Sequence, residues 1–460
     1  MKSTYEKSFA YFVTSVLCFL CSQSVAAQEK LTYTQIVEIA VKNNILLRQA
    51  RLQEQYSFQS LRQIQWDLLP KLNASTNVNL NFGRSVDPFS YQFVNQQITT
   101  GGGGIFADIT IFQGAQRLFQ ISQNKHLLEA DRSNVQKVTN DLVLNIATSY
   151  LLILNNIDIL SAAEEQMRVV QLQLDREEDQ YSLGSKTLAD LAQARSQVAA
   201  AELNVTSAQN NLDFSYLNLS RLMNRPPSKK FLVQKIEPNK LELRQRQVSP
   251  DELAKTALKI NPDIARAKNI RLAAFQGKEA AAASSFPRLS LQYNLGTGFS
   301  TALKHKVNYW GAQASKTEVV RFFKQFDQNF NQNVGFHLSI PIFNGNISRF
   351  SVRKAKIDYQ IALASEELAE TTLTQIINEA VLDLKSAEKK YYSSIRAYES
   401  SKEAFTVVEE RYNVGLVNSL DYTQAQINSN KAQYEMIRAK YDLIFRDKII
   451  DFYLGNSLDF

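Results

Sequence analysis

The sequence predicts a mainly α-helical protein with a minority of β strands, built from two copies of one helix-strand-strand-helix-helix unit. Three observations predict this fold. The chain repeats itself at a nearly fixed offset, the hydrophobic period of each copy changes from helical to alternating and back, and one helical stretch is too long for a compact domain. Two elongated copies account for the 460 residues better than several compact domains do.

The two copies align with one change of offset. Residues 31–72 match residues 248–289 at an offset of 217, and past that point the offset becomes 231. The second copy therefore has 14 extra residues in its strand-loop region. We expect a signal segment at 1–27, a first repeat at 28–225, a linker at 226–247 and a second repeat at 248–460.

Residues 1–27 are typical of a secretory signal, with a basic start, an apolar core at 11–20 and small residues at 25–27. We therefore expect the mature protein to leave the cytoplasm. Both cysteines, Cys18 and Cys21, fall in this segment, so the mature chain is predicted to lack thiols, disulfides and thiolate metal sites.

The charge and hydropathy of the mature chain exclude two classes of protein. Without two lysines and one glutamate of the signal segment the formal charge falls from +7 to +6, with no clustered basic stripe, so nucleic-acid binding is not expected. The most apolar mature stretch, residues 142–160, is interrupted by asparagine and aspartate. If the chain crosses a membrane, strands must do so.

Each copy begins with a helix and continues into strands. Apolar residues at steps of three and four predict helices at 32–66 and 250–284. Alternating apolar and amide side chains then predict a strand at 72–82 in the first copy and one at 289–299 in the second. Each strand is therefore expected to have one apolar and one polar face.

Return strands are expected at 105–112 and 334–343, and Pro341 marks a strand end or a bulge. The loops at 84–103 and 301–332 are long and polar, and we expect no internal fold in them. Residues 101–104 are four glycines. No Gly-Lys-Ser/Thr follows them, so a flexible turn is favoured over a phosphate-binding loop.

A helix of 68 residues is expected at 115–182, about 100 Å long at ~1.5 Å per residue. It ends before Gly184, and a returning helix starts near Thr187, which indicates a helical hairpin. The returning helix has a heptad seam whose second position is mostly small. Its residues are Leu191, Val198, Val205, Leu212 and Leu219, and Ala194, Ala201, Ala208, Ser215 and Leu222. A short strand is expected at 231–233.

Strands with one apolar and one polar face, in an exported chain, suit a barrel with lipid outside and water inside. The alternative is a soluble sheet packed on its apolar face. Four strands cannot close a barrel. Two chains would supply eight strands and three would supply twelve, and only twelve leave an appreciable bore, which favours three chains.

Together these features resemble the TolC family of outer-membrane efflux channels, over essentially the whole mature sequence. The resemblance implies a homotrimer with a 12-stranded transmembrane β-barrel in the outer membrane and a periplasmic α-barrel of long helical hairpins. It also implies docking to a periplasmic adaptor and an inner-membrane transporter. The residues that carry it are the duplicated plan, Pro70 and Pro287 before the strands, Gly114 and Gly345 after them, and the two hairpin tips with Asp190 and Asp421.

The resemblance implies that the hairpin tips contact the adaptor. Val414, Gly415 and Leu416 match the family's tip motif, and the first copy has a partial match in Leu183, Gly184 and Ser185. The alternative is a simple glycine turn that caps each helix. An exposed Val or Leu at the end of so long a hairpin is harder to explain structurally.

The resemblance also implies a periplasmic gate made of Asp190, Asp421 and Tyr412. The alternative is that both aspartates complete capping boxes with Thr187 and Asn418, and the two roles are compatible. A ring of six carboxylates would attract cations and respond to pH. Val417 and Gln424 stand where the family pattern has a gating Arg and a second Asp, and Lys186 is a candidate substitute for the Arg.

The remaining residues suggest no chemistry. No nucleophile-base pair, cofactor loop or metal-ligand spacing is present, so neither an enzyme nor a cofactor is expected. Residues 164–178 and 402–411 are interpreted as solvated helix faces. The loop aromatics suit an interface belt, an extracellular plug or local packing equally: Tyr309, Trp310, Phe322, Phe323, Phe326 and Phe330. The expected function is a passive exit duct, and the alternative is a periplasmic coiled-coil scaffold or adaptor without a pore.

Overall fold

The computed structural model describes residues 29–95, 97–226, 231–235, 249–307, 316–456 and 458. The predicted signal segment and most of the predicted linker lie outside them. The chain forms two compact units, and each unit takes segments from both halves of the sequence. The hairpin unit comprises residues up to Gln49 together with 136–261 and 372–460, and the strand unit comprises Ala50–Val135 and Pro262–Thr371.

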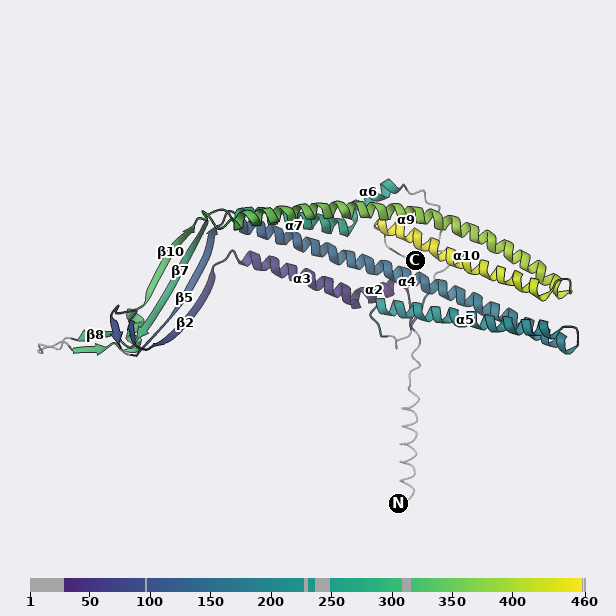
Figure 1. Cartoon of the computed structure of the whole chain (residues 1–460), viewed down its shortest axis with the longest axis horizontal. Coiled ribbons are helices and arrows are strands. Elements are labelled where there is room, and N and C mark those ends of the chain that lie inside the picture. The colour runs from purple at the N-terminus through teal and green to yellow at the C-terminus, as the bar shows by residue number, and fades with distance from the viewer. Residues whose placement is uncertain are drawn as a thin grey trace, which may run out of the picture. The chain divides into compact units, whose positions relative to one another are not determined.

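The helices of the two halves have equal lengths, and Figure 1 labels them along the chain. The first pair is α2 (Tyr33–Asn43) and α6 (Pro250–Ile260), with 11 residues each, and the second is α3 (Ile45–Trp66) and α7 (Pro262–Ala283), with 22 each. The long helices are α4 (Gln116–Ser182) and α9 (Ile347–Asn413), with 67 residues each. The returning helices are α5 (Leu188–Leu222) and α10 (Ser419–Tyr453), with 35 residues each. The long helix expected at 115–182 is therefore confirmed to within one residue.

The first predicted helix of each half is wrong in one respect, because each is broken in two. Asn44 and Asn261 have extended backbones, with ψ of 127° and 125°. The Asn44 side chain then accepts a hydrogen bond from the Leu47 N–H at 3.1 Å and caps α3. Asn261 precedes Pro262, whose ring disfavours a helical conformation at the residue before it.

The core of the hairpin unit follows the predicted heptad of α5. Its buried residues are Leu191, Ala194, Val198, Ala201, Ala208, Leu212, Ser215 and Leu219, with Ser220 beside them. On α4, Val170 packs with Val198 and Ala201, and Met167 and Leu174 lie against this cluster. The small residues allow the two helix axes to approach closely.

Helix α4 also contains one stretch that is long and apolar enough to cross a membrane by length and composition alone. The stretch is 44% buried within the fold. Ile146, Tyr150 and Ile153 are almost inaccessible to solvent. The Tyr150 hydroxyl donates to the Gln234 carbonyl at 2.7 Å, so this segment is part of the core of the hairpin unit. Nearby, β1 (Glu29–Leu31) pairs in parallel with β6 (Phe231–Val233), which confirms the short strand.

The strand unit contains a four-stranded antiparallel sheet in the order β10-β7-β5-β2 (Figure 1). The strands are β2 (Lys71–Asn81), β5 (Ile98–Phe112), β7 (Arg288–Ser300) and β10 (Asn331–Ser339). Strand β10 ends two residues before Pro341, so the strand expected at 334–343 is shorter than predicted and Pro341 does follow its end. Strands β2 and β10 form the two edges.

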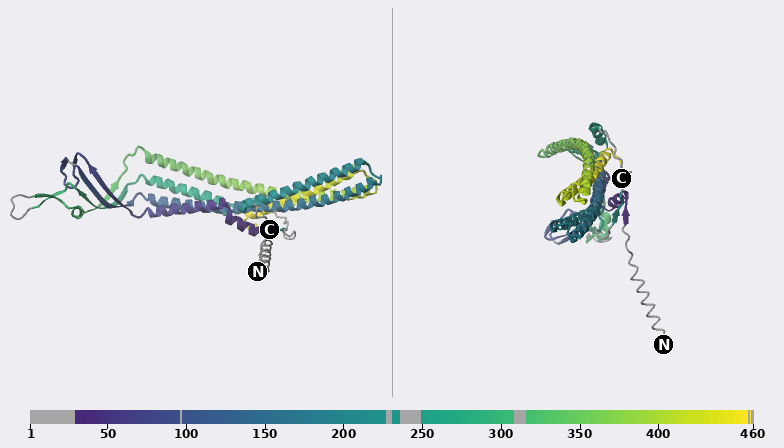
Figure 2. Two further views of the ribbon diagram at one scale, coloured as in Figure 1. Left: turned by 90° about the horizontal axis from the view of Figure 1, so that it is seen from below. Right: turned by 90° about the vertical axis from the view of Figure 1, so that its right-hand side faces the viewer.

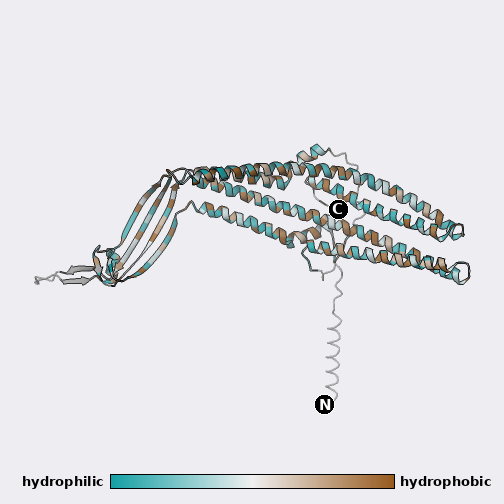
Figure 3. Cartoon of the chain, in the orientation of Figure 1, coloured by the Kyte–Doolittle hydropathy of each residue, from teal (hydrophilic) through white to brown (hydrophobic). Residues whose placement is uncertain are grey.

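The register places most apolar side chains of the four strands on one face, with Ile98 and Phe106 of β5 on the other. That face carries Leu72, Ala74, Val78 and Leu80 of β2, Ile105, Ala107 and Ile109 of β5, Leu289, Leu291, Tyr293 and Leu295 of β7, and Val334, Phe336 and Leu338 of β10. The opposite face is rich in Asn, Gln and Ser, and Figure 3 shows the two kinds of residue alternating along the strands. Several apolar residues are exposed, including Leu72 at 71% and Phe336 at 72%.

The prediction of a flexible turn at Gly101–Gly104 is wrong, because all four glycines lie within β5. A Cβ at Gly104 would lie 2.7 Å from the Leu295 carbonyl oxygen, and one at Gly101 would lie 2.5 Å from the Phe299 ring. The glycines therefore let neighbouring strands and side chains approach closely.

The expectation that the loops have no internal fold is also wrong. They contain β3 (Arg84–Val86), β4 (Phe93–Asn95), β8 (Lys304–Val307), β9 (Lys316–Val319) and α8 (Phe322–Gln328). Buried Asp87 accepts hydrogen bonds from the Ser300 hydroxyl and from two backbone N–H groups of its own loop. Buried Gln325 accepts from the Ser300 N–H at 2.8 Å, so both loops are attached to the end of β7.

Candidate functional site

The two helical hairpins, α4–α5 and α9–α10, turn at the same end of the hairpin unit (Figures 1 and 2). Each turn contains a glycine with positive φ, Gly184 at +75° and Gly415 at +78°. In both, the glycine N–H donates to the carbonyl three residues earlier, and the next N–H donates to the carbonyl five residues earlier, all at 2.9–3.0 Å. A Cβ at either glycine would meet nothing within 4 Å, so conformation and not space requires glycine here.

The predicted adaptor-contact residues lie at these tips and are exposed. Leu183 is 82% exposed, Val414 70% and Leu416 73%. The hydroxyl of Ser185 donates to the Gln180 carbonyl at 2.8 Å and supports the first turn. The turn geometry explains the glycines and Ser185 but gives no structural role to the three apolar side chains.

Asp190 caps α5 and also contacts the second hairpin. It forms a complete capping box with Thr187, as predicted. The Ser419 hydroxyl, at the start of α10, donates to Asp190 Oδ1 at 3.2 Å. Hydrogen bonds from the Thr187 side chain and backbone, then the Ser419 hydroxyl and the Lys186 charge, hold the pKa of Asp190 below its ordinary value, against a smaller opposing effect of burial.

Asp421 occupies the matching position of α10 but forms no such contact with the other hairpin in the described structure. Its N–H donates to the Asn418 side chain at 2.8 Å, without the reciprocal bond that would complete a capping box. The predicted box at this end is therefore only half formed. The carboxylate of Asp421 is exposed and has no hydrogen bond or ion pair within the described part of the chain.

Tyr412, the third predicted gate residue, joins the two hairpins through its hydroxyl. The buried phenol donates to Glu177 Oε1 on α4 and accepts from the Lys186 ammonium at 3.1 Å. The Lys186 Nζ lies 3.7 Å from the same Glu177 oxygen. Burial, and then the hydrogen bond to Glu177, raise the pKa of Tyr412, so its hydroxyl stays a neutral donor. We call Glu177, Lys186 and Tyr412 the tip cluster.

A second group of contacts lies beside the tip cluster. The Tyr412 ring stacks on Tyr422 with centroids 4.7 Å apart and planes at 25°. The Gln197 side chain of α5 also donates to the Thr423 hydroxyl of α10. Burial raises the pKa of Tyr422 to about 12. The Gln197–Thr423 bond therefore adds another polar contact between the two hairpins near their tips, whereas the Tyr412–Tyr422 stack holds α9 against α10 within the second hairpin.

The prediction that Glu177 lies on a solvated helix face is wrong, because this residue is only 2% exposed. Its position follows the heptad that buries Ala163 and Val170, each seven residues before the next. That spacing was the available signal, and the acidic neighbours obscured it. Glu177 Oε1 also accepts from Gln173 Nε2 at 2.8 Å, whereas Oε2 is buried without a hydrogen-bond partner among the described residues.

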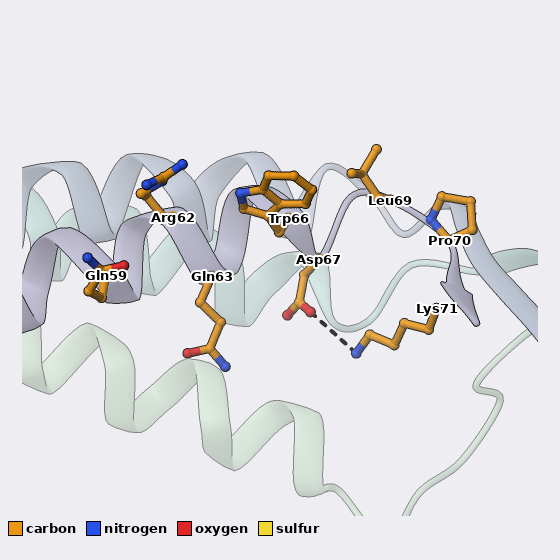
Figure 4. Close-up of a pocket in the computed structure, with 8 residues that line it drawn as sticks. All are labelled: Gln59, Arg62, Gln63, Trp66, Asp67, Leu69, Pro70 and Lys71. Carbon is orange, nitrogen blue, oxygen red and sulfur yellow. Dashed lines mark ion pairs between the residues drawn. The ribbon is translucent and has the colours of Figure 1, made fainter. Parts of the chain in front are cut away.

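A shallow surface hollow at the junction of α3 and β2 is the other concave feature to consider (Figure 4). It is lined by Gln59, Arg62, Gln63, Trp66, Asp67, Leu69, Pro70 and Lys71. All of these except Asp67 are exposed. The Asp67 carboxylate already pairs with Lys71 at 3.3 Å and Arg117 at 3.1 Å, so it joins the helix ends to the strand and is not left for a ligand.

Comparison with known proteins identifies this arrangement. Residues 36–225 and 253–456 match the family described as outer membrane efflux protein, which is most of the chain. The chain belongs to the outer membrane efflux protein family. This is a family of efflux channels and not of enzymes, and its members, including this efflux protein, are located in the outer membrane with a periplasmic helical extension.

Individual relatives are similar over most of their length. The outer membrane protein TolC of Escherichia coli strain K12 is 25% identical over 434 residues, covering 92% of this chain and 81% of that protein. The pyoverdine export outer membrane protein OpmQ of Pseudomonas putida is 26% identical over 330 residues, 68% of this chain and 61% of that protein. The Campylobacter jejuni CmeC outer membrane channel has the same fold, with a TM-score of 0.78 at 18% identity over 92% of this chain and 85% of that one.

Proposed function

We propose that this efflux protein is the outer-membrane exit duct of a tripartite efflux or type I secretion system. Substrates delivered by an inner-membrane transporter and a periplasmic adaptor would pass through it without chemical change. The observation that carries the proposal is the four-stranded sheet, which has an exposed apolar face, an amide-rich face and two edges that pair with no other strand in the described residues. An apolar outside and a polar inside are what a water-filled membrane barrel requires.

The duct is proposed to be a homotrimer with a 12-stranded barrel. Four strands are too few to close, because even the smallest membrane barrels have about eight. Pairing of β2 in one chain with β10 in the next satisfies both edges and gives twelve strands in three chains. The equal helix lengths of the two halves support six near-equivalent hairpins around the same axis.

The hairpin tips are proposed to be the contact for the adaptor and the site of gating. Exposed Val414 and Leu416 offer apolar surface to a helical hairpin of the adaptor. The tip cluster and the Ser419–Asp190 bond hold the two hairpins together, so separation of the hairpins would have to break them. Lys186 is proposed to supply the positive charge of the gate, because Val417 stands where the family pattern has a gating Arg.

Planar bilayer recording tests the duct and the gate separately. Purified wild-type trimers should form channels, and Tyr412→Phe should raise their conductance because it removes the hydroxyl that joins the hairpins. Asp190→Ala with Asp421→Ala should alter conductance and its pH dependence. Correctly folded trimers without any channel would contradict the duct and leave a scaffold without a pore. Unchanged conductance in the carboxylate variant would contradict only the role of the carboxylates.

Cysteine crosslinking tests the adaptor contact, because the mature chain is predicted to have no cysteine of its own. Leu416→Cys should crosslink to a co-expressed adaptor that carries cysteines in its hairpin. Glu367→Cys, exposed on α9 but in the strand unit, is the matched control and should not. Equal crosslinking at both positions, or none at Leu416 with any adaptor, would contradict the tip assignment.

A further inference from the structure

Helix α8 lies in the second loop and is fixed to the end of β7. The Thr297 hydroxyl donates to the Phe326 carbonyl at 2.6 Å. The Phe299 ring packs against Phe322 and Phe326, with centroids 4.6 and 6.1 Å apart. Helix α8 therefore has a defined position on the sheet, and the strand residues that it contacts show which face of the sheet it covers.

These contacts place α8 over the apolar face of the sheet. Thr297 and Phe299 point to the same side as Leu291 and Leu295, because side chains alternate along a strand. The first loop lies on the other side, where a Cβ at Gly298 would come within 2.6 Å of the Phe89 ring. The two loops thus cover opposite faces at the same end of β7.

The height of α8 matches the border of the membrane. Leu289 and Phe299 are ten residues apart on β7, about 33 Å along a strand at ~3.3 Å per residue. A tilt of about 40° reduces this to about 25 Å, the usual height of the apolar band of a membrane barrel. In the proposed barrel, with the apolar band beginning at Leu289, α8 would therefore lie where the hydrocarbon ends and the headgroups begin.

The surface of α8 has the composition of that layer. Phe323 is 85% exposed, and Phe322 remains 45% exposed despite its ring contacts. Arg321 and Lys324 are exposed beside them and form no ion pair with any residue that the structure describes, while Asp327 is the helix's single acid. Exposed aromatic rings next to unpaired cations suit anionic lipid headgroups, since rings enter the interface and ammonium and guanidinium groups bind phosphate.

We propose that α8 is a lipid anchor, with Phe323 inserted at the headgroup level of the outer leaflet and with Arg321 and Lys324 bound to lipid phosphates. The proposal rests on the proposed function only in requiring that the apolar face of the sheet meets lipid. It also explains why the three aromatics of α8 divide into two sets, since Phe322 and Phe326 pack on Phe299 whereas Phe323 is exposed. Tyr309 and Trp310 lie outside the described residues.

Tryptophan fluorescence in lipid vesicles tests the insertion. In a Trp66→Phe, Trp310→Phe background, Phe323→Trp introduces one reporter at an exposed position. Its emission should be quenched by phosphatidylcholine brominated near the carbonyl end of the acyl chain, and less by lipid brominated near the methyl end. Quenching by aqueous iodide should be weak.

The matched control is Tyr91→Trp in the same background. Tyr91 is also an exposed aromatic, 83% accessible, but it belongs to the first loop, which lies on the amide-rich face. It should be quenched by iodide and not by brominated lipid. If the tryptophan at position 323 is quenched like the one at position 91 while the same vesicles show channel conductance, the lipid anchor is wrong and the duct is not contradicted. If the vesicles do not conduct although position 323 meets lipid, the duct is wrong and the anchor stands.

The cations are tested by the choice of brominated headgroup. With the reporter at 323, brominated phosphatidylglycerol should be preferred over brominated phosphatidylcholine. Arg321→Gln with Lys324→Gln should lower that preference by about fivefold for each charge removed. An equal preference before and after the double substitution would overturn the phosphate contacts. Asp327→Asn removes a negative charge and should raise the preference for phosphatidylglycerol.

Discussion

Glu177 is a carboxylate withdrawn from water on the seam of α4, and the cost of its burial depends on a small number of partners. Tyr412 and Gln173 donate to one of its oxygens, Lys186 approaches the same oxygen, and the other oxygen has no partner in the described structure. A buried carboxylate with incomplete partners is stable only while those partners stay in place. The tip cluster therefore makes the contact between the hairpins sensitive to a single hydroxyl.

Removal of that hydroxyl in Tyr412→Phe should lower the free energy of local opening at the tips by about 1–3 kcal/mol, because a buried charged acceptor loses its donor. Hydrogen exchange of peptides at the C-terminal end of α4 measures this. Tyr412→Phe combined with Glu177→Gln should cost less than the sum of the single changes, since both partners are then altered.

Glu178→Gln is the control for that experiment. Glu178 is the neighbouring acid, is exposed, and pairs with Arg195 at 2.9 Å. Its loss should change tip exchange by less than about 1 kcal/mol. If the tip peptides exchange hydrogen at the same rate in the Tyr412→Phe and Glu178→Gln variants, the tip cluster does not hold the hairpins together.

Asp190 makes the first tip sensitive to acid. The hydrogen bonds from Thr187 hold its pKa below the ordinary value of 3.8, so its contribution is complete above pH 3.8 and is lost as the pH falls through the lowered pKa. Hydrogen exchange of the first turn of α5, corrected for intrinsic rates, should be steady from about pH 7 to about pH 5 and accelerate below pH 3.8. Asp190→Asn should abolish this acid-dependent step, and a step that persists in the variant would assign it to another group.

At the scale of elements, the glycine run of β5 shows how one strand accommodates its neighbours. Gly103 and Gly104 are adjacent but face opposite sides. A Cβ would lie 3.5 Å from its nearest neighbour at Gly103 and 2.7 Å from the Leu295 carbonyl at Gly104. The sequence alone does not distinguish the two positions.

Gly104→Ala should therefore destabilise the sheet by about 1–3 kcal/mol, the usual cost of forced overpacking. Gly103→Ala should be neutral or slightly stabilising, because alanine loses less entropy in a strand than glycine. Thermal loss of the folded form on semi-native gels compares the two. Equal melting of both variants would show that strand spacing does not depend on Gly104.

The sequence predicted elements that depend on local periodicity and capping. Helices α4 and α5 were located by an unbroken helical period, by Gly184 and by the Thr187 cap. Elements stabilised by distant partners were missed, since the loops are shaped by the bonds of Asp87 and Gln325 to Ser300. The two hairpin turns could be located from the sequence, but the burial of Glu177 could not, because it depends on a phenol 235 residues later in the chain.

At the scale of the whole molecule, closure of the proposed barrel depends on strand edges that meet only between chains. A chain with Val78→Cys in β2 and one further cysteine in β10 should form disulfide-linked dimers and trimers. The series Val334→Cys, Phe336→Cys and Leu338→Cys covers the possible registers, because bonding requires Cα atoms within about 7 Å. Non-reducing gels should show a ladder that stops at three chains.

Two controls define this result. Each single-cysteine variant should stay at the size of one chain, since β2 and β10 are the opposite edges of the sheet. Val78→Cys with Leu289→Cys should also give no ladder, because β7 is an interior strand. A ladder that stops at two chains, or none at any register, would contradict the trimer.

The unpaired edges of β2 and β10 also bear on the kinetics of assembly. Within the part of the chain that the structure describes, each edge leaves a row of backbone groups without a strand partner beside exposed apolar side chains, which is a template for aggregation. In the proposed trimer these groups would find partners only on collision with other chains, so the final step of maturation would be multimolecular and its rate would depend on the local concentration of newly exported protein. Slow synthesis should therefore lengthen the lifetime of the vulnerable intermediate, and periplasmic chaperones and proteases act on that interval.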